Sequence, residues 1–237
     1  MKISIISMPR CGTSSLSSIF SSYGSKNEFM EAESVKSISS FNRKDMSLHD
    51  LSVFLRMRWS YDMKIDAASF NFLVKDILLD LFPDMQFISL VRQCDLWVNS
   101  FIKMLVYYYK DVFELKSPPL WMNDYGLIYS PFFDWDTLYE IASGTISSDG
   151  DRLIDSLVDF WIYQTNSILE FSQKTNSLVI NTENISSSID ILSQYTHLPL
   201  NHNQIDSYVN QARIPGMVLP PQMRSHINKK ANILLPS

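Results

Sequence analysis

The strongest structural signal in the chain lies in residues 2–20, which read KISIISMPRCGTSSLSSIF. Residues 2–7 form a short apolar run rich in isoleucine, and β-branched residues in such a run favour a buried strand. A proline and a glycine end the run, and the apolar residues that follow recur at helical spacing. Ser14 and Ser15 suit the N-terminal cap of this helix. The stretch therefore predicts a strand, a tight loop and a helix.

Later segments continue this alternation. In chain order we expect helices at 46–58 and 70–82, a strand at 86–91, a long helix capped by Asp95, a helix at 151–173 and a strand at 178–180. Strands that alternate with helices predict an α/β fold with a mostly parallel central sheet flanked by helices. Residues 107–150 show no clean period, so we interpret them as loops and short helices. The tail from Ile214 is expected to be irregular.

The composition excludes several classes of protein. A chain of 237 residues that is 46% hydrophobic can bury a substantial core, which argues against disorder. Its formal net charge of -5 argues against a general nucleic-acid or anionic-membrane binder. The chain has two cysteines, Cys11 and Cys94, so disulfides cannot be what holds a fold of this size together. We therefore expect a reducing, cytoplasmic compartment. No segment approaches the roughly 18 apolar residues of a membrane helix.

Residues 9–15, PRCGTSS, have the character of an anion-binding loop. The amides of such a loop and of the first helical turn point at one spot, and Gly12 allows the backbone to approach a ligand closely. Side-chain donors in the loop are Arg10, Thr13, Ser14 and Ser15. Compared with the nucleotide loop GxxxxGKS/T, the spacing is kept, but Thr13 replaces the lysine that stabilises a transferring γ-phosphate. The loop can still hold a 5′-phosphate with Arg10 as the cation, and the simpler alternative is an ordinary strand-to-helix turn.

A second candidate anion site follows the predicted strand at 86–91. Arg92 ends this strand, and Ser100 comes eight residues later in the next helix. Ligands of open parallel sheets bind at the carboxyl ends of the strands, so Arg92 and the first loop should lie on the same side. The planar fork of arginine suits phosphate, whereas an NTPase more often has a magnesium-binding Asp here. The alternative is a surface arginine at a strand end.

Together these two elements resemble the sulfotransferases that use 3′-phosphoadenosine 5′-phosphosulfate (PAPS). The 5′-phosphosulfate loop of that family commonly reads Pro, Lys or Arg, Ser, Gly, Thr, then Ser or Thr; residues 9–14 differ mainly by Cys11 in place of Ser. The 3′-phosphate site of the family is an Arg at a strand end and a Ser eight residues later, which Arg92 and Ser100 match. Looser matches are Trp161, LVINTENI at 178–185 and HINK at 226–229, where some members have a lid.

The resemblance implies a single P-loop-like α/β domain over residues 1–237. Within it we expect a cofactor-binding core at 1–106, acceptor-side loops at 107–150, a helix-strand-helix completion at 151–213 and a lid or tail at 214–237. The implied PAPS-binding residues are Arg10, Cys11, Gly12, Thr13, Ser14, Ser15, Arg92, Ser100, Asn228 and Lys229. The chain lacks the R-K-G segment of cytosolic aryl sulfotransferases, so the resemblance is nearer to bacterial, viral, carbohydrate or protein-tyrosine types.

Sulfuryl transfer also needs a cation at the leaving phosphate and a base for the acceptor proton. Arg10 suits the first role. The family places its base soon after the first helix or on a strand before the 3′-phosphate motif, which ranks Glu31 first, Asp66 second and Glu28 third. The alternative for each carboxylate, taken alone, is a structural role, because acidic residues near a helix start are usually solvated caps.

The expected activity is transfer of a sulfuryl group from PAPS to a hydroxyl of a small-molecule, carbohydrate or peptide acceptor. No metal is expected, because the four histidines lack ligand spacing. Two alternatives stay open: a P-loop kinase, and a non-catalytic relative that binds nucleotide or a partner through the aromatic segment 107–135. Those aromatic residues can equally line an acceptor pocket or pack helices and loops.

Overall fold

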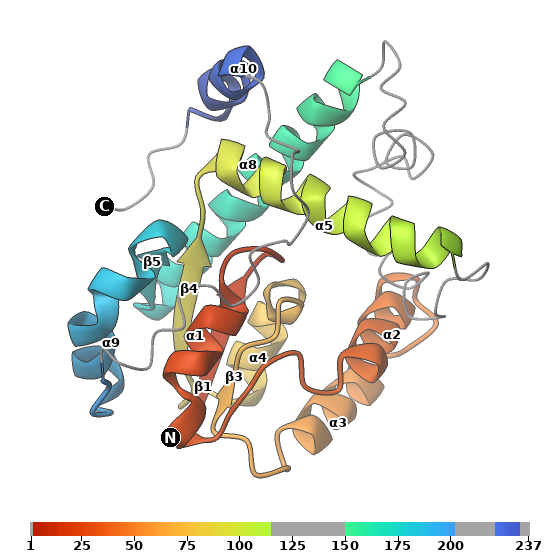
Figure 1. Cartoon of the computed structure of the whole chain (residues 1–237). Coiled ribbons are helices and arrows are strands. Elements are labelled where there is room, and N and C mark those ends of the chain that lie inside the picture. The colour runs from red at the N-terminus through yellow and green to blue at the C-terminus, as the bar shows by residue number, and fades with distance from the viewer. Residues whose placement is uncertain (1, 115–149, 202–220, 233–237) are drawn as a thin grey trace. The chain divides into compact units, whose positions relative to one another are not determined.

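The computed structural model describes residues 2–114, 150–201 and 221–232. The described strands form a five-stranded sheet in the order β2-β3-β1-β4-β5, and every neighbouring pair is parallel (Figure 1). The prediction of an α/β fold with a parallel sheet flanked by helices is therefore confirmed. The strands are β1 (Ile3–Ser7), β2 (Ser25–Lys26), β3 (Ile65–Asp66), β4 (Gln86–Val91) and β5 (Leu178–Asn181).

Several of the helices agree with periodic segments of the sequence. The α-helices are α1 (Thr13–Ile19), α2 (Glu31–Asn42), α3 (Leu48–Arg58), α4 (Lys75–Leu81), α5 (Cys94–Glu114), α8 (Gly150–Thr175), α9 (Ile189–Thr196) and α10 (Pro221–Ala231). Short 3₁₀ helices are η1 (Ser21–Tyr23), η2 (Asn71–Leu73) and η3 (Thr182–Ser188). The helices expected at 46–58, 70–82 and 151–173 correspond to α3, to η2 with α4, and to α8.

Strand β1 lies in the middle of the sheet and is buried on both faces. All five of its residues are buried, and it pairs along its whole length with β4 and at two positions with β3. Three of its five residues are isoleucine, as suits a strand that is covered on both faces, and Ser4 and Ser7 are buried with them. Its carboxyl end leads directly into the loop at 8–12, so the sheet presents that loop from a rigid, buried base.

Two expected helix caps are wrong. Helix α1 is capped by Gly12, which has a left-handed φ of 89°, and Ser14 and Ser15 lie inside the first turn. The sharp backbone turn at this glycine starts the helix without a side-chain cap. Helix α5 begins at Cys94, so Asp95 belongs to its first turn, where a carboxylate favours the positive end of the helix dipole.

The segment from 107, expected to form loops and short helices, contains the end of a longer helix, and the tail, expected to be irregular, also contains a helix. Residues 107–114 continue α5, and α10 occupies 221–231 of the tail, beginning with a proline at the first helical position. Residues 115–149, with the aromatic residues Trp121, Phe132, Phe133 and Trp135, lie outside the described residues. Helix α2 was not expected, because its sequence EAESVKSISSFN is serine-rich and gives a weak apolar pattern.

The chain divides into two compact units. The first contains residues 1–92 and 165–211 with the whole sheet, and the second contains residues 93–164 and 212–234. The second unit has its own aromatic core, in which Trp97 stacks on Phe101 and Phe160 at ring-centroid distances of 4.8 and 5.8 Å. The four-part division expected from the sequence stays a prediction.

In the second unit, an exposed ion-pair cluster joins α10 to α8. The Lys230 ammonium lies 3.3 Å from a carboxylate oxygen of Asp155 and 2.9 Å from one of Asp159, and His226 also contacts Asp155. Among the described residues, we find no helix with the length and hydropathy that crossing a bilayer requires.

Candidate active site

The loop between β1 and α1 has the backbone conformation of an anion-binding concavity. Arg10 and Gly12 both have left-handed φ values, 68° and 89°, and the residue between them is fully buried. Alternating backbone conformations of this kind point successive amides towards one position, and the first amides of α1 have no acceptor within the helix. The loop stands at the carboxyl end of the central strand, where open parallel sheets bind ligands.

Gly12 is needed for packing as well as for its φ angle. A Cβ atom at this position would lie 2.9 Å from Cδ1 of Ile185 and 3.1 Å from Cγ2 of Thr182. Both neighbours belong to η3, which follows β5. The left-handed φ of 89° is what most strongly favours glycine here, and a side chain would also require Ile185 and Thr182 to shift.

Cys11 contributes to the loop through its backbone. Its side chain is fully buried, and burial raises the pKa of the thiol to about 12, so the thiol stays protonated. Its carbonyl accepts a hydrogen bond of 2.8 Å from Oγ1 of Thr182, whose hydroxyl also lies 2.9 Å from the Val91 carbonyl. The difference from the family's Ser at this position thus affects a side chain that points into the core.

Arg92 lies beside the first loop, as the parallel sheet predicted. Its Nη1 donates to the Arg10 carbonyl at 2.8 Å, and its Nε donates to Oε1 of Glu183 at 3.2 Å. Arg92 is at the end of β4, and Glu183 follows β5 in η3. Three strand ends are thus connected through one guanidinium, which orients the loop and brings a second cation next to it.

Thr182 and Glu183 are site residues to which the sequence assigned no role. They lie in the loose match at 178–185, and the usable signal was their position directly after a predicted strand. In a parallel sheet, residues directly after a strand face the same crevice as the loop after β1. The side chain of Asn181 caps η3 by accepting from the Glu183 amide at 3.3 Å, which holds this turn in place.

The segment that carries Glu28 is attached to the first turn of α1. The side-chain amide of Asn27 donates to Oγ of Ser14 at 3.1 Å, and Ser17 and Ser25 share a hydrogen bond of 2.8 Å. Glu28 therefore directly follows a residue that touches the candidate anion loop. No local sequence pattern predicts this attachment, because the partners Asn27 and Ser14 lie 13 residues apart.

Glu28 has an altered acidity. Its side chain is half-buried, and the Ser69 amide donates to its two carboxylate oxygens at 2.9 and 3.1 Å. Burial raises the pKa of Glu28 to about 8; the Ser69 hydrogen bonds oppose this rise, and the nearby charges of Glu31 and Asp66 add to it. A carboxyl group with such a pKa can exchange a proton near neutral pH.

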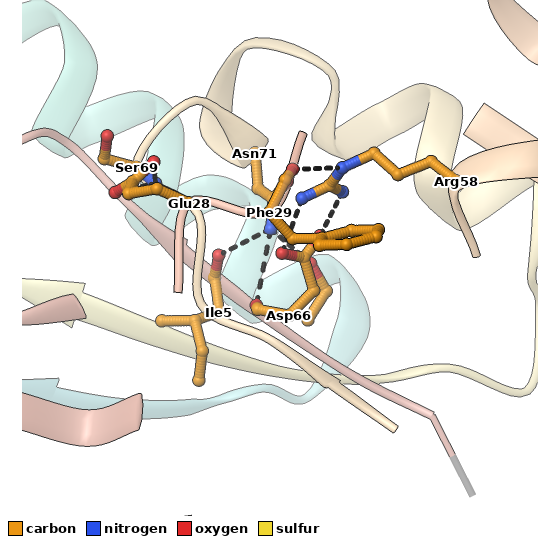
Figure 2. A network of polar contacts seen from close by, with 8 residues as sticks. Ile5, Glu28, Phe29, Arg58, Asp66, Ser69 and Asn71 are labelled. Atoms are coloured by element: carbon orange, nitrogen blue, oxygen red, sulfur yellow. Dashed lines mark hydrogen bonds and ion pairs between the residues drawn. The ribbon is translucent and has the colours of Figure 1, made fainter. Parts of the chain in front are cut away.

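Asp66 and Glu31 occupy different environments. The carboxylate of Asp66 forms a fully buried, two-pronged ion pair with Arg58, drawn in Figure 2. Glu31 is half-buried and begins α2. The structure thus brings Glu28 and Asp66 into one polar network.

The remaining predicted site residues belong to the second unit. Ser100 is half-buried in α5, whereas Asn228 and Lys229 are exposed on α10. Their placement is described within that unit alone. Within the described parts of the chain, no group of three His, Cys, Asp or Glu residues could hold a metal ion.

Comparison with known protein families gives a match that covers the loop at 9–15 and Arg92. The family described as the sulfotransferase domain matches the chain over residues 2–151. The chain belongs to this sulfotransferase domain family. No curated protein and no solved structure matches it.

The match to the sulfotransferase domain runs from β1 to the start of α8, so it includes the loop at 9–15, Arg92 and Ser100. The protein is therefore a PAPS-dependent sulfotransferase. Thr182, Glu183 and the residues of α10 lie beyond the matched range.

Proposed function

We propose that this sulfotransferase moves a sulfuryl group from PAPS to a hydroxyl of a small-molecule, carbohydrate or peptide acceptor and releases 3′-phosphoadenosine 5′-phosphate. The observation that carries the proposal is the loop at 9–15, with two left-handed residues at the end of the central strand and Arg92 bonded to its backbone. Bound PAPS supplies an electrophilic sulfur and a phosphate leaving group. Everything else in the reaction depends on how the chain binds and orients the reactants.

The donor side is built from the first loop. The amides of residues 12–15 and the hydroxyls of Thr13, Ser14 and Ser15 suit the phosphosulfate oxygens. Arg10 provides positive charge where negative charge grows on the leaving phosphate. Cys11 acts through its backbone alone, because its thiol is buried and protonated.

Arg92 and Ser100 are proposed to hold the 3′-phosphate, with Asn228 and Lys229 from α10 at the same nucleotide. The support for Arg92 is its hydrogen bond to the Arg10 carbonyl, which puts its guanidinium beside the loop. Glu183 holds the Nε edge of the same guanidinium. Ser100, Asn228 and Lys229 are proposed on the family resemblance.

For the general base we propose Glu28 ahead of Glu31. A base works best when its pKa lies near the working pH, and burial raises the pKa of Glu28 to about 8. Its neighbour Asn27 contacts Ser14, next to the proposed phosphosulfate site. Asp66 is already committed to Arg58 within the core, which favours a supporting role over proton transfer. No metal is required by this arrangement.

A thermal-shift panel tests the proposal. Binding to the folded state raises the melting temperature, so about 1 mM 3′-phosphoadenosine 5′-phosphate should stabilise the protein while ATP with Mg²⁺ should not. Adenosine 5′-phosphate, which lacks the 3′-phosphate, is the matched control and should stabilise it less. Stabilisation by ATP with Mg²⁺ alone would favour a kinase, and stabilisation by neither nucleotide would favour a non-catalytic relative.

A further inference from the structure

The most buried charges in the described part of the first unit belong to Arg58 and Asp66. Both side chains are 0% exposed, and Nη2 of Arg58 donates to Oδ1 of Asp66 at 2.7 Å while Nη1 donates to Oδ2. Arg58 is the last residue of α3, and Asp66 is the last residue of β3. The guanidinium carbon also lies 4.9 Å from the centre of the Phe70 ring. Burying such a pair has a large desolvation cost, and apolar residues would often fill the space as well.

The same guanidinium holds the backbone next to Glu28. Its Nε donates to the carbonyl of Phe29 at 3.0 Å, as Figure 2 shows. The two residues on either side of Phe29, Glu28 and Met30, have left-handed φ values of 49° and 52°. Such a conformation is unfavourable for a non-glycine residue and persists only where surrounding contacts enforce it.

A second set of bonds fixes the other side of Glu28. Asp66 leads through two alanines, Ala67 and Ala68, to Ser69, whose amide donates to the Glu28 carboxylate. Asn71 donates from its side-chain amide to Oγ of Ser4 at 3.2 Å and to the Asp66 and Ile5 carbonyls at 3.4 Å. The turn at 66–71 is thereby attached to the central strand, and it carries the donor that faces Glu28.

We propose that Arg58 and Asp66 are positioning residues that hold the strained turn at 28–30 and so place the Glu28 carboxylate for proton transfer. Asp66 orients the guanidinium, and the guanidinium holds the Phe29 carbonyl. The pair therefore acts through Glu28 and makes no contact of its own with a reactant. This inference rests on the proposed role of Glu28 as the base.

Asp66 also contributes to the electrostatic environment of Glu28. Charged groups that act on its carboxylate are Glu31 at the start of α2 and Asp66 in β3, and both raise its pKa. Desolvation has the larger effect. If the Phe29 carbonyl is released, the turn can relax and the Glu28 side chain can reach water, so its pKa should fall towards the ordinary value.

The first test follows the titration of Glu28 directly. The chain has seven glutamates, so protein labelled with ¹³C at the glutamate carboxyl carbons gives a small set of NMR signals, and Glu28→Gln assigns the relevant one. Arg58→Lys keeps a positive charge for Asp66 but removes the Nε donor. We expect the Glu28 midpoint to fall by at least one pH unit in this variant. Arg43→Lys, which alters the exposed Arg43–Asp45 pair, is the matched control and should leave the midpoint unchanged.

An unchanged Glu28 midpoint in folded Arg58→Lys would overturn the proposal. A merely structural role of the pair would lower the melting temperature without moving the midpoint at temperatures where the protein is folded. This separates positioning of Glu28 from general stabilisation of the core.

A second variant keeps the question decidable if Arg58→Lys fails to fold. The double variant Arg58→Met with Asp66→Leu replaces the ion pair by apolar side chains, an exchange that proteins often tolerate. Amide hydrogen exchange at Ser69 should become at least tenfold faster, while the Gln86 amide, bonded to the Lys2 carbonyl at 2.9 Å, should keep its rate. An unchanged rate at Ser69, or equal acceleration at both amides, would contradict the proposal.

These measurements need neither donor nor acceptor. If the unmodified protein fails to bind 3′-phosphoadenosine 5′-phosphate in calorimetry, the proposed function fails while the titration still reports on the positioning of Glu28. If it binds the nucleotide and the titration is insensitive to Arg58, the positioning proposal alone is wrong.

Discussion

Glu28 shows how one residue acquires a property that its type does not predict. It combines a left-handed backbone, a half-buried carboxylate and a backbone donor at Ser69. Glu31, three residues later, is the first residue of α2. Both were acceptable bases from the family spacing, and the Ser69 hydrogen bonds and raised pKa of Glu28 favour Glu28. Acidity at this site thus follows from the fold around Glu28.

Glu28→Gln should change how stability depends on pH. The folded-state pKa of about 8 lies above the ordinary value of 4.5, so the folded protein holds a proton that the unfolded chain releases. This contribution to stability is complete below pH 4.5 and is lost as the pH rises through 8, by up to about 1.4 kcal/mol per pH unit. Urea denaturation between pH 5 and 9 should show the wild type losing stability relative to Glu28→Gln up to about pH 8, with a constant difference above it.

The control for this experiment is Glu33→Gln, which alters an exposed glutamate of α2. Its stability should follow that of the wild type across the same range. Parallel pH profiles for the wild type and Glu28→Gln would mean that Glu28 titrates alike in the folded and unfolded states, contrary to the expectation.

At the scale of elements, the ends of β1, β4 and β5 meet at one place. Arg92 joins the first two, Thr182 lies between the Cys11 and Val91 carbonyls, and Glu183 holds the remaining edge of the guanidinium. Gly12 favours this convergence, because its left-handed φ suits glycine and a larger side chain would press on Ile185 and Thr182 of η3. The loop is therefore supported on two sides before any ligand arrives.

Arg92→Ala should weaken the binding of 3′-phosphoadenosine 5′-phosphate. The change removes a proposed charge-assisted contact to phosphate and also releases the Arg10 carbonyl, so we expect a loss of affinity of about 10- to 100-fold. Isothermal titration calorimetry measures this directly. Arg43→Ala, which removes an exposed arginine of the same unit, should bind the nucleotide like the wild type. Equal affinity of Arg92→Ala and the wild type would remove Arg92 from the site.

At the scale of the whole molecule, the net charge of -5 restricts the kind of anion that can bind. Long polyanions need several cations spread over a surface, because their affinity comes from neutralising many phosphates. A small phosphorylated nucleotide needs few positive groups in one place, and Arg10 and Arg92 are the groups that we propose for it. The acidic net charge is therefore compatible with a sulfotransferase, whose donor is a small nucleotide.

We accordingly expect no binding of nucleic acid by the chain. The fluorescence anisotropy of a labelled duplex of about 20 base pairs should stay constant up to about 10 μM protein in about 150 mM salt. The 3′-phosphoadenosine 5′-phosphate complex should form under the same conditions. Saturable duplex binding that weakens steeply with salt would reveal a basic surface beyond the loop and refute this expectation.

The parts of the fold that the sequence predicted are those encoded by neighbouring residues. The run at 2–7, the loop at 9–15 and the strand ending at Arg92 each carry a local pattern, and they sufficed for the parallel sheet and the family. Strand β2 and helix α2 lack such a pattern. Strand β2 is two residues long, and α2 is polar and serine-rich, so contacts with the rest of the unit decide their conformation.

Local sequence patterns were enough to predict the α/β class and the sulfotransferase family, because short-range hydrophobic order encodes the strands and helices that carry the motifs. The environment of the carboxylates depends on contacts between distant parts of the chain. Glu28 meets a donor 41 residues away at Ser69, and Arg58 reaches back 29 residues to Phe29. Burial raises the pKa of Glu28, and Asp66 forms a buried ion pair with Arg58. Both depend on the packing of distant segments against one another. For that reason Asp66, a candidate base in the sequence, is proposed as a support for Glu28 in the folded protein.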